Sequence, residues 1–319
     1  MKKLAIFSLL ALTLSVSFAR PPVEGDVLDS NNFVVGVDAS LNGVYRKNNP
    51  STPYLYGKID GQYITYPTFA SNSKQNSGQI DVDINLNARY GILDYFEIYA
   101  NANGYYQNSN VDNDFYSSKD ISSKSNIINF GNANIGLMAT LYKGETFRVI
   151  IGDNSDIISN MAFYDFNSQM NYFGGHTFFL NLITQKVDAD KFASFTSQFY
   201  YRLNLTQKYK SSLADAPDFK FKNGDEAGVR FLWQFGKENS LGFIGGNVAF
   251  RAADRLDGNK PEMVLYNGQD YSSIGVGFSL GGKKDINDHL GYKISVDFMS
   301  YALDYNTSTV GINFGLYFK

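Results

Sequence analysis

Hydrophobic and polar residues alternate along most of this chain, and residues 80–90 show the pattern well. One set of positions there is apolar: Ile80, Val82, Ile84, Leu86, Ala88 and Tyr90. The set between them carries charges and amides: Asp81, Asp83, Asn85, Asn87 and Arg89. Successive side chains of a strand point to opposite faces of its sheet, so this alternation predicts a strand with one apolar and one polar face.

About twelve segments carry this pattern, and no helical period interrupts them. They lie near residues 33–45, 79–91, 95–107, 128–142, 146–153, 171–184, 192–205, 222–235, 241–252, 270–281, 289–303 and 308–318. Short and long connections alternate between them, except for a last short one near 304–307. The short turns lie near 92–94, 143–145, 185–191, 236–240 and 282–288. The long polar connections lie near 46–78, 108–127, 154–170, 206–221 and 253–269.

Strand length, the even number and the alternating connections predict an all-β fold, a transmembrane antiparallel up-and-down β-barrel of the bacterial outer-membrane type. Hydrocarbon offers backbone groups no hydrogen-bond partner, so a sheet that spans it must close on itself. The apolar face would then meet outer-membrane lipid and lipopolysaccharide, with short turns periplasmic and long loops extracellular. A secreted β-sandwich is the alternative, but it needs no such regular alternation of connections.

The N-terminus carries a predicted signal peptide. Lys2 and Lys3 precede an apolar stretch over residues 4–16, and Ser17 and Ala19 place small residues where a signal peptidase cleaves. We therefore expect a signal peptide at 1–19, a periplasmic N-terminal segment at 20–32 and the barrel at 33–319. Export to the outer membrane would also make the barrel-assembly machinery a partner. A membrane anchor is less consistent with so short an apolar stretch.

Composition removes several classes of function. Mean hydropathy is −0.25, and no apolar run of membrane-spanning length follows the N-terminus, which excludes a bundle of transmembrane helices. The 28 basic and 31 acidic residues argue against nucleic-acid binding. The absence of Cys removes thiolate catalysis and Cys-based metal sites.

Two stretches resemble a known barrel family. Residues 90–98 read Tyr-Gly-Ile-Leu-Asp-Tyr-Phe-Glu-Ile, and residues 129–137 read Asn-Phe-Gly-Asn-Ala-Asn-Ile-Gly-Leu. This is similar to the turn and later Gly-rich strand of the outer-membrane proteins associated with the meta-pathway of phenol degradation. It departs at Asn132 and Ala133, where that family has Gly-Asp. The resemblance implies a tight periplasmic turn and a barrel more than it implies a solute. A looser similarity to twelve-stranded nucleoside channels rests on strand number and lumen aromatics.

Enzyme chemistry finds little support. A lipid hydrolase in the barrel wall, as in outer-membrane phospholipases, needs a His beside a Ser. His176 has no Ser two residues on, and His289 lies at a predicted turn. The acidic runs at 110–114 and 153–156 are typical of hydrated loops rather than cation sites. We expect no enzyme activity, no cofactor and no metal.

The predicted lumen face supplies the candidate site. The candidate pore-lining residues are Asp38, Asp81, Asp83, Glu97, Tyr99, Arg148, Tyr200, Arg202, Arg230, Arg251, Lys293 and Asp297. Acidic residues gather on the early strands and arginines on the middle strands, which lie opposite each other in a ring of twelve. We hypothesise a transverse field across a narrow aqueous passage that orients polar solutes and rejects apolar ones.

These features predict a channel for passive or weakly selective passage of small polar or aromatic solutes. Two alternatives stay open. Ion pairs and long side chains can fill a barrel of this size, so that it conducts nothing. The protein would then be a structural or adhesive barrel that acts through its long extracellular loops.

Overall fold

The structure is a computed structural model of the 319-residue chain. It describes residues 21–50, 56–59, 62–65, 74–114, 121–161, 169–188, 191–209, 219–222, 224–237, 239–252, 255–256, 272–303 and 307–319. The predicted signal peptide at 1–19 lies outside these residues and remains a prediction. Within the described part of the chain, no helix is long and apolar enough to cross a membrane.

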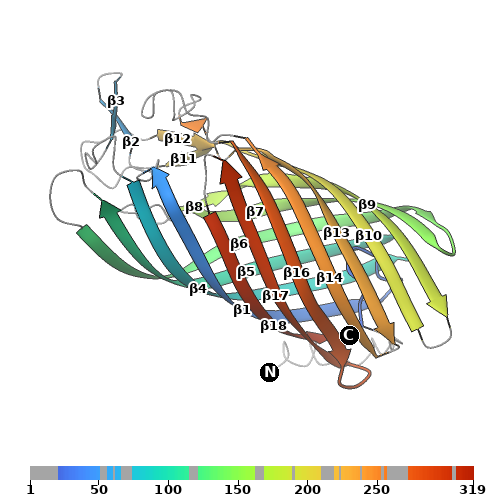
Figure 1. Cartoon of the computed structure of the whole chain (residues 1–319). Helices are drawn as coiled ribbons and strands as arrows, with labels where there is room; N and C mark the ends of the chain where they lie inside the picture. The colour runs from blue at the N-terminus through green and yellow to red at the C-terminus, as the bar shows by residue number, and fades with distance from the viewer. Residues whose placement is uncertain are drawn as a thin grey trace, which may run out of the picture.

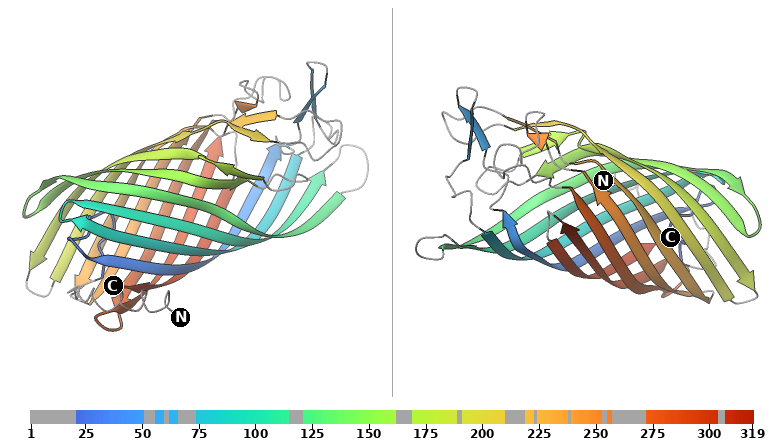
Figure 2. Two further views of the ribbon diagram at one scale, coloured as in Figure 1. Left: turned by 180° about the vertical axis from the view of Figure 1, so that it is seen from behind. Right: turned by 45° about the horizontal axis from the view of Figure 1, so that its top comes forward.

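Twelve antiparallel strands form a closed barrel (Figures 1 and 2). Each strand pairs with its neighbours in chain order, and β1 pairs with β18 to close the ring. The strands are β1 (Phe33–Pro50), β4 (Lys74–Leu93), β5 (Phe96–Asp114), β6 (Ile121–Lys143), β7 (Phe147–Met161), β9 (Gly175–Asp188), β10 (Lys191–Asn204), β13 (Glu226–Lys237), β14 (Ser240–Arg251), β16 (Ser273–Asp285), β17 (Leu290–Leu303) and β18 (Thr307–Phe318). This confirms the predicted fold.

The two ends of the barrel differ in their connections. We call one the short-turn end, because the strands there are joined through residues 94–95, 144–146, 189–190, 238–239 and 286–289. The opposite, long-loop end carries additional short strands (Figure 1). These are β2 (Tyr56–Ile59), β3 (Gln62–Thr65), β8 (Gln169–Tyr172), β11 (Gln207–Tyr209), β12 (Phe219–Lys222) and β15 (Arg255–Leu256).

Several strands extend further toward the long-loop end than the sequence pattern predicts. The predicted loop at 108–127 is mostly a continuation of β5 and β6, which pair as far as Asn113 and Ile121. Likewise, β7 continues to Met161 instead of ending near residue 153. Alternation requires an apolar environment on one side. Polar strand ends therefore carry no such signal, although their backbones still pair.

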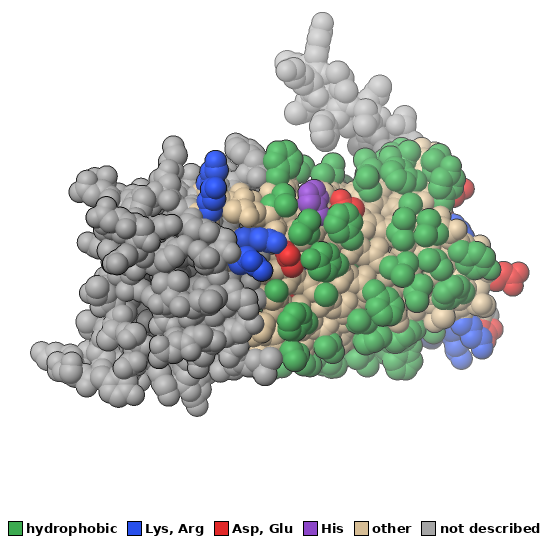
Figure 3. Space-filling model, turned by 90° about the horizontal axis from the view of Figure 1, so that it is seen from above, with side chains coloured by type: hydrophobic (Ala, Val, Ile, Leu, Met, Phe, Trp, Pro, Cys, Tyr) green, Lys and Arg blue, Asp and Glu red, His purple; other side chains and the backbone are tan. Residues whose placement is uncertain are grey.

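Apolar side chains cover the outside of the barrel. Ile84, Leu137, Phe231 and Ile312 are 53 %, 45 %, 42 % and 54 % exposed, although each lies within a strand. Figure 3 shows hydrophobic side chains spread over the visible barrel wall. The polar positions between them point inward. The sidedness predicted from the alternation is confirmed.

Residues 21–28 lie inside the barrel, near the short-turn end, and residues 29–32 lead from its rim to β1. Asp26, Val27 and Leu28 are buried there, and their partners come from inward-facing positions of the strands. We call residues 21–28 the inner segment. The sequence predicted only a periplasmic segment before the first strand. A short stretch without periodicity carries no signal that it enters a lumen.

Candidate functional site

Glu24 anchors the inner segment to β16. The Lys283 Nζ donates to the Glu24 Oε1 at 2.6 Å and to the Pro22 carbonyl oxygen at 3.1 Å. The Lys293 Nζ lies 3.7 Å from the same carboxyl oxygen. The Glu24 amide in turn donates to the Gln234 Oε1 at 3.1 Å. The Lys283 ammonium holds the pKa of Glu24 well below its usual range, and this attraction outweighs the opposing effect of burial.

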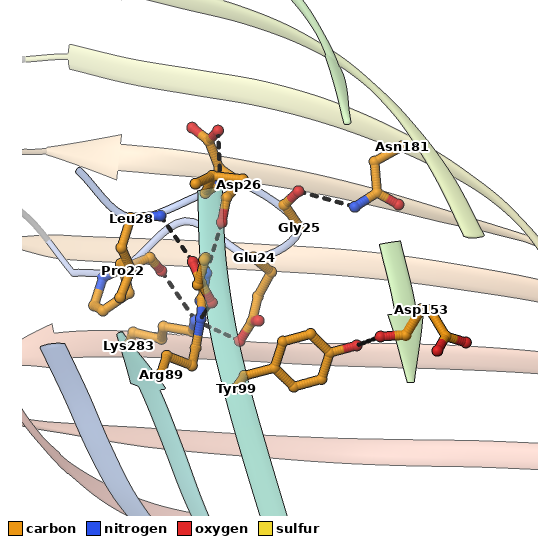
Figure 4. Close-up of polar contacts among 12 residues, drawn as sticks. Pro22, Glu24, Gly25, Asp26, Leu28, Arg89, Tyr99, Asp153, Asn181 and Lys283 are labelled. Atoms are coloured by element: carbon orange, nitrogen blue, oxygen red, sulfur yellow. Dashed lines mark hydrogen bonds and ion pairs between the residues drawn. The ribbon is translucent and has the colours of Figure 1, made fainter. Parts of the chain in front are cut away.

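A second set of polar contacts holds Asp26 and Leu28 (Figure 4). The Arg89 Nη2 donates to the Asp26 carbonyl oxygen at 2.6 Å, and its Nε donates to the Glu97 Oε1 at 2.6 Å. The other Glu97 oxygen accepts the Leu28 amide at 2.8 Å. Arg148 forms an ion pair with the Asp26 carboxylate. Glu97 is fully buried, so these partners supply the hydrogen bonds that water cannot.

A backbone turn at Gly25 completes the docking. Gly25 has a φ of +82°, a conformation that favours glycine, and its carbonyl oxygen accepts the Asn181 Nδ2 at 2.9 Å. A side chain here would approach Asn181 and Thr196 to 3.2 Å. The inner segment is thus fitted closely to the barrel wall.

Apolar contacts add to this docking. Val27 packs with Met138, Ile150 and Ile183, and Leu28 packs in a second cluster. Burial of each aliphatic side chain contributes about 1.5 to 3 kcal/mol. The inner wall at the short-turn end is therefore partly apolar, because it faces the inner segment rather than water.

A cavity of about 530 Å³ lies inside the barrel beside the inner segment. Carboxamides form much of its lining: Asn85, Asn87, Asn101, Asn134, Asn154, Asn181 and Gln198. Arg89, Arg230, Lys283 and Lys293 supply positive charge, while Glu24 and Asp38 supply negative charge. The rings of Tyr99, Phe179 and Tyr317 also line it. A cavity of this size and polarity suits a small hydrogen-bonding molecule.

The structure places the predicted pore-lining residues in three groups. Asp38, Tyr99, Arg230 and Lys293 line the 530 Å³ cavity. Glu97 and Arg148 instead hold the inner segment. The rest lie elsewhere along the inner wall: Asp81, Asp83, Tyr200, Arg202, Arg251 and Asp297.

Several charged residues of the hypothesised transverse field have hydrogen-bond or ion-pair partners close by on the barrel wall. Arg202 forms an ion pair with Asp156 at 2.5 Å. The sequence pattern predicts a loop at Asp156. Asp83 accepts a hydrogen bond from Asn42 at 2.6 Å, and Asp38 accepts one from Asn87. Tyr200 donates to Glu226 at 2.6 Å. Arg202 is therefore paired with a carboxylate close by, and the carboxylates of Asp83, Asp38 and Glu226 accept hydrogen bonds from neutral neighbours.

A Ser, a His and an Asp meet on the outer, lipid-facing side of the wall. Ser155 and His176 are directly paired between β7 and β9, and the Ser155 Oγ lies 2.8 Å from the His176 Nδ1. The Ser155 hydroxyl also contacts the Asp153 Oδ2 at 2.8 Å. The sequence did not predict the contact of Ser155 with His176, because the two residues lie on different strands. In a catalytic triad the His lies between the Ser and the Asp. Here Ser155 lies between the other two, so the cluster lacks that arrangement.

We compared the chain with known proteins by sequence and by structure. The sequence matches no protein-family model and no curated protein sequence. The COG4313 outer-membrane channel from Pseudomonas putida F1 is similar in structure, with a TM-score of 0.52 and 10 % identity over 93 % of this chain and 98 % of that one. The translocator domain of the autotransporter NalP from Neisseria meningitidis gives 0.46 at 9 % identity, over 100 % and 97 %. The CymD monoaromatic hydrocarbon channel gives 0.44 at 9 % identity, over 92 % and 89 %. The likeness shows a fold of the bacterial outer-membrane barrel type.

Proposed function

We propose that this protein is an outer-membrane channel for small polar solutes, with a passage narrowed at the short-turn end by the inner segment. The observation that carries the proposal is the 530 Å³ cavity inside a closed barrel, lined by amides and by charges of both signs. Hydroxyl, amide and charged groups of a solute find hydrogen-bond partners in such a lining, which an apolar solute would leave unused.

Ring-bearing polar solutes also suit the lumen. Tyr99, Phe179 and Tyr317 border the cavity beside the amides, and such rings offer stacking surfaces. The resemblance of residues 90–98 to proteins of the phenol meta-pathway concerns the turn rather than the solute. Residues 94–95 form a tight turn between β4 and β5, in keeping with that motif.

The orientation follows from the usual arrangement of such barrels. We infer that the short-turn end and the inner segment face the periplasm, while the long-loop end faces outward. The predicted signal peptide supports this direction of export. In this orientation the inner segment controls exit to the periplasm.

Liposome swelling tests the proposal. Purified protein is reconstituted, and swelling is followed in iso-osmotic solutions of sugars, amino acids and aromatic acids of increasing size. We expect measurable entry of small polar solutes with a sharp size limit. Swelling equal to that of protein-free liposomes for every solute, from correctly folded protein, would contradict the proposal.

A structural or adhesive role is the second candidate. The hairpin of β2 and β3 and the small sheet of β11, β12 and β15 stand at the long-loop end (Figures 1 and 2). Because β5 extends to Asp114 and β6 begins at Ile121, the predicted loops at 46–78 and 108–127 can be shortened only within residues 51–73 and 115–120 if the barrel strands are to stay intact. Shortening them should leave solute entry intact. Loss of cell or surface binding after the same change would favour the second role.

A further inference from the structure

A second hollow of about 400 Å³ lies against the inner wall formed by β13, β14, β16 and β17. Glycines keep its floor free of side chains. A Cβ at Gly245 would collide with the Ser279 hydroxyl, and one at Gly277 would come within 2.7 Å of the Met299 sulfur. Glu24 and Gly25 of the inner segment border the hollow from the lumen side.

Opposite charges lie at two sides of this hollow. Arg230 on β13 and Asp297 on β17 both line it. Two strands, β14 and β16, lie between them. The register aligns Arg230 with Met299, two residues from Asp297. At the usual spacing, the two Cα positions are therefore about 14 Å apart across the strands and about 7 Å apart along them, less the curvature of the barrel.

Both charged groups have only neutral partners. The Arg230 Nη1 donates to the Gln198 Oε1 at 3.2 Å, and its guanidinium lies 4.4 Å from the centre of the Tyr200 ring. Asp297 accepts hydrogen bonds from Ser295 and Asn313. Among the residues that the structure describes, neither group has an opposite charge within 4.0 Å. The third charge at the hollow, Glu24, is already neutralised by Lys283.

Two polar atoms in the lining also lack partners. The Thr196 Oγ1 and the Asn247 Oδ1 are buried and make no hydrogen bond within the described part of the chain. Thr196 is only 5 % exposed, and both residues line the hollow. Buried polar atoms are normally satisfied, so these two have hydrogen-bonding capacity left for water or a ligand at the hollow.

We propose that this hollow binds a zwitterionic short peptide, whose charged ends are further apart than those of a single amino acid. Its carboxylate would pair with Arg230, its ammonium group with Asp297, and its amide or polar atoms with Thr196 and Asn247. The inference deepens the proposed channel function, since it names a solute class for the same lumen. A neutral polyol would leave both charges unused, and a simple anion or cation would use only one.

Calorimetric titration of the folded protein in detergent tests this site directly. Glycylglycine is the probe, with N-acetylglycinamide, acetate and ethylammonium as analogues that lack one or both charges. We expect glycylglycine to bind, and each lost charge to weaken binding by about tenfold. Arg230→Gln and Asp297→Asn should weaken glycylglycine binding to the same degree, whereas Arg230→Lys should retain most of it.

Lys284→Gln and Asp288→Asn serve as controls, because both residues are exposed near the short-turn end and line neither cavity. Equal affinity for glycylglycine and N-acetylglycinamide would overturn the inference. So would unchanged binding in both folded variants, or no binding at all. Binding without liposome swelling would contradict the channel and leave this site standing. Swelling without selective binding would do the reverse.

Discussion

Individual ion pairs in this barrel differ in value because their burial differs. Arg89 and Glu97 are 17 % and 0 % exposed, and Glu97 also accepts a backbone amide of the inner segment. Lys143 and Asp29 form a longer pair, with side chains 41 % and 66 % exposed. A buried pair broken on one side leaves an uncompensated charge, whereas an exposed pair loses little.

We therefore predict that Arg89→Met lowers the free energy of unfolding by about 3 to 5 kcal/mol. Lys143→Met, the matched control, should cost less than about 1 kcal/mol. Denaturant unfolding of the reconstituted protein measures both values. A further Glu97→Gln change in the Arg89→Met background should restore part of the loss. Equal effects of the two single changes would show that Glu97 is not desolvated as the structure indicates.

At the scale of elements, the sequence predicted which face of each strand points outward. It did not predict which side chains of different segments contact one another. Alternation identified all twelve strands because lipid acts on every second residue. It missed the far end of β7, including Asp156, where the apolar residues Ile157 and Ile158 are adjacent and do not alternate with polar ones. The contact of Ser155 with His176 and the docking of Glu24 join residues distant in sequence. Both contacts depend on how the strands are paired and on where the inner segment lies. The pattern within a single segment does not contain that information.

Neighbouring positions on β4 test this sidedness. Ile84 faces outward and is 53 % exposed, whereas Asn85 lines the lumen cavity. Ile84→Lys should destabilise the barrel in a bilayer by about 2 to 4 kcal/mol, because lipid cannot solvate the charge. Asn85→Lys should have a much smaller effect. Unfolding titrations in liposomes compare the two variants, and a larger cost at Asn85 would reverse the assignment of faces.

The inner segment should stay docked between pH 7 and pH 5. A carboxyl group whose pKa is lowered on folding stabilises the folded state above its ordinary pKa, about 4.3 for Glu. That contribution is lost only as pH falls from there toward the lowered pKa of Glu24. Hydrogen exchange of residues 22–28, corrected for intrinsic rates, should show equal protection at both pH values. Loss of protection at pH 5 would mean that Lys283 does not hold Glu24 in this way.

At the scale of the whole molecule, two solvents determine the architecture. Lipid selects the apolar outer face, and the lumen keeps charges, amides and the inner segment. The segment seals part of the short-turn end through Lys283, Arg148 and Arg89, while the two cavities remain beside it. The sequence therefore reveals the wall of the barrel more readily than its contents.

Ion conductance across planar bilayers tests the channel most directly. We predict small, stable current steps for the wild-type protein, and larger steps for a Lys283→Gln, Arg148→Gln variant in which the inner segment is loosened. Lys284→Gln should match the wild type. Absence of current from wild type and double variant alike, with both shown to be folded and inserted, would contradict the account.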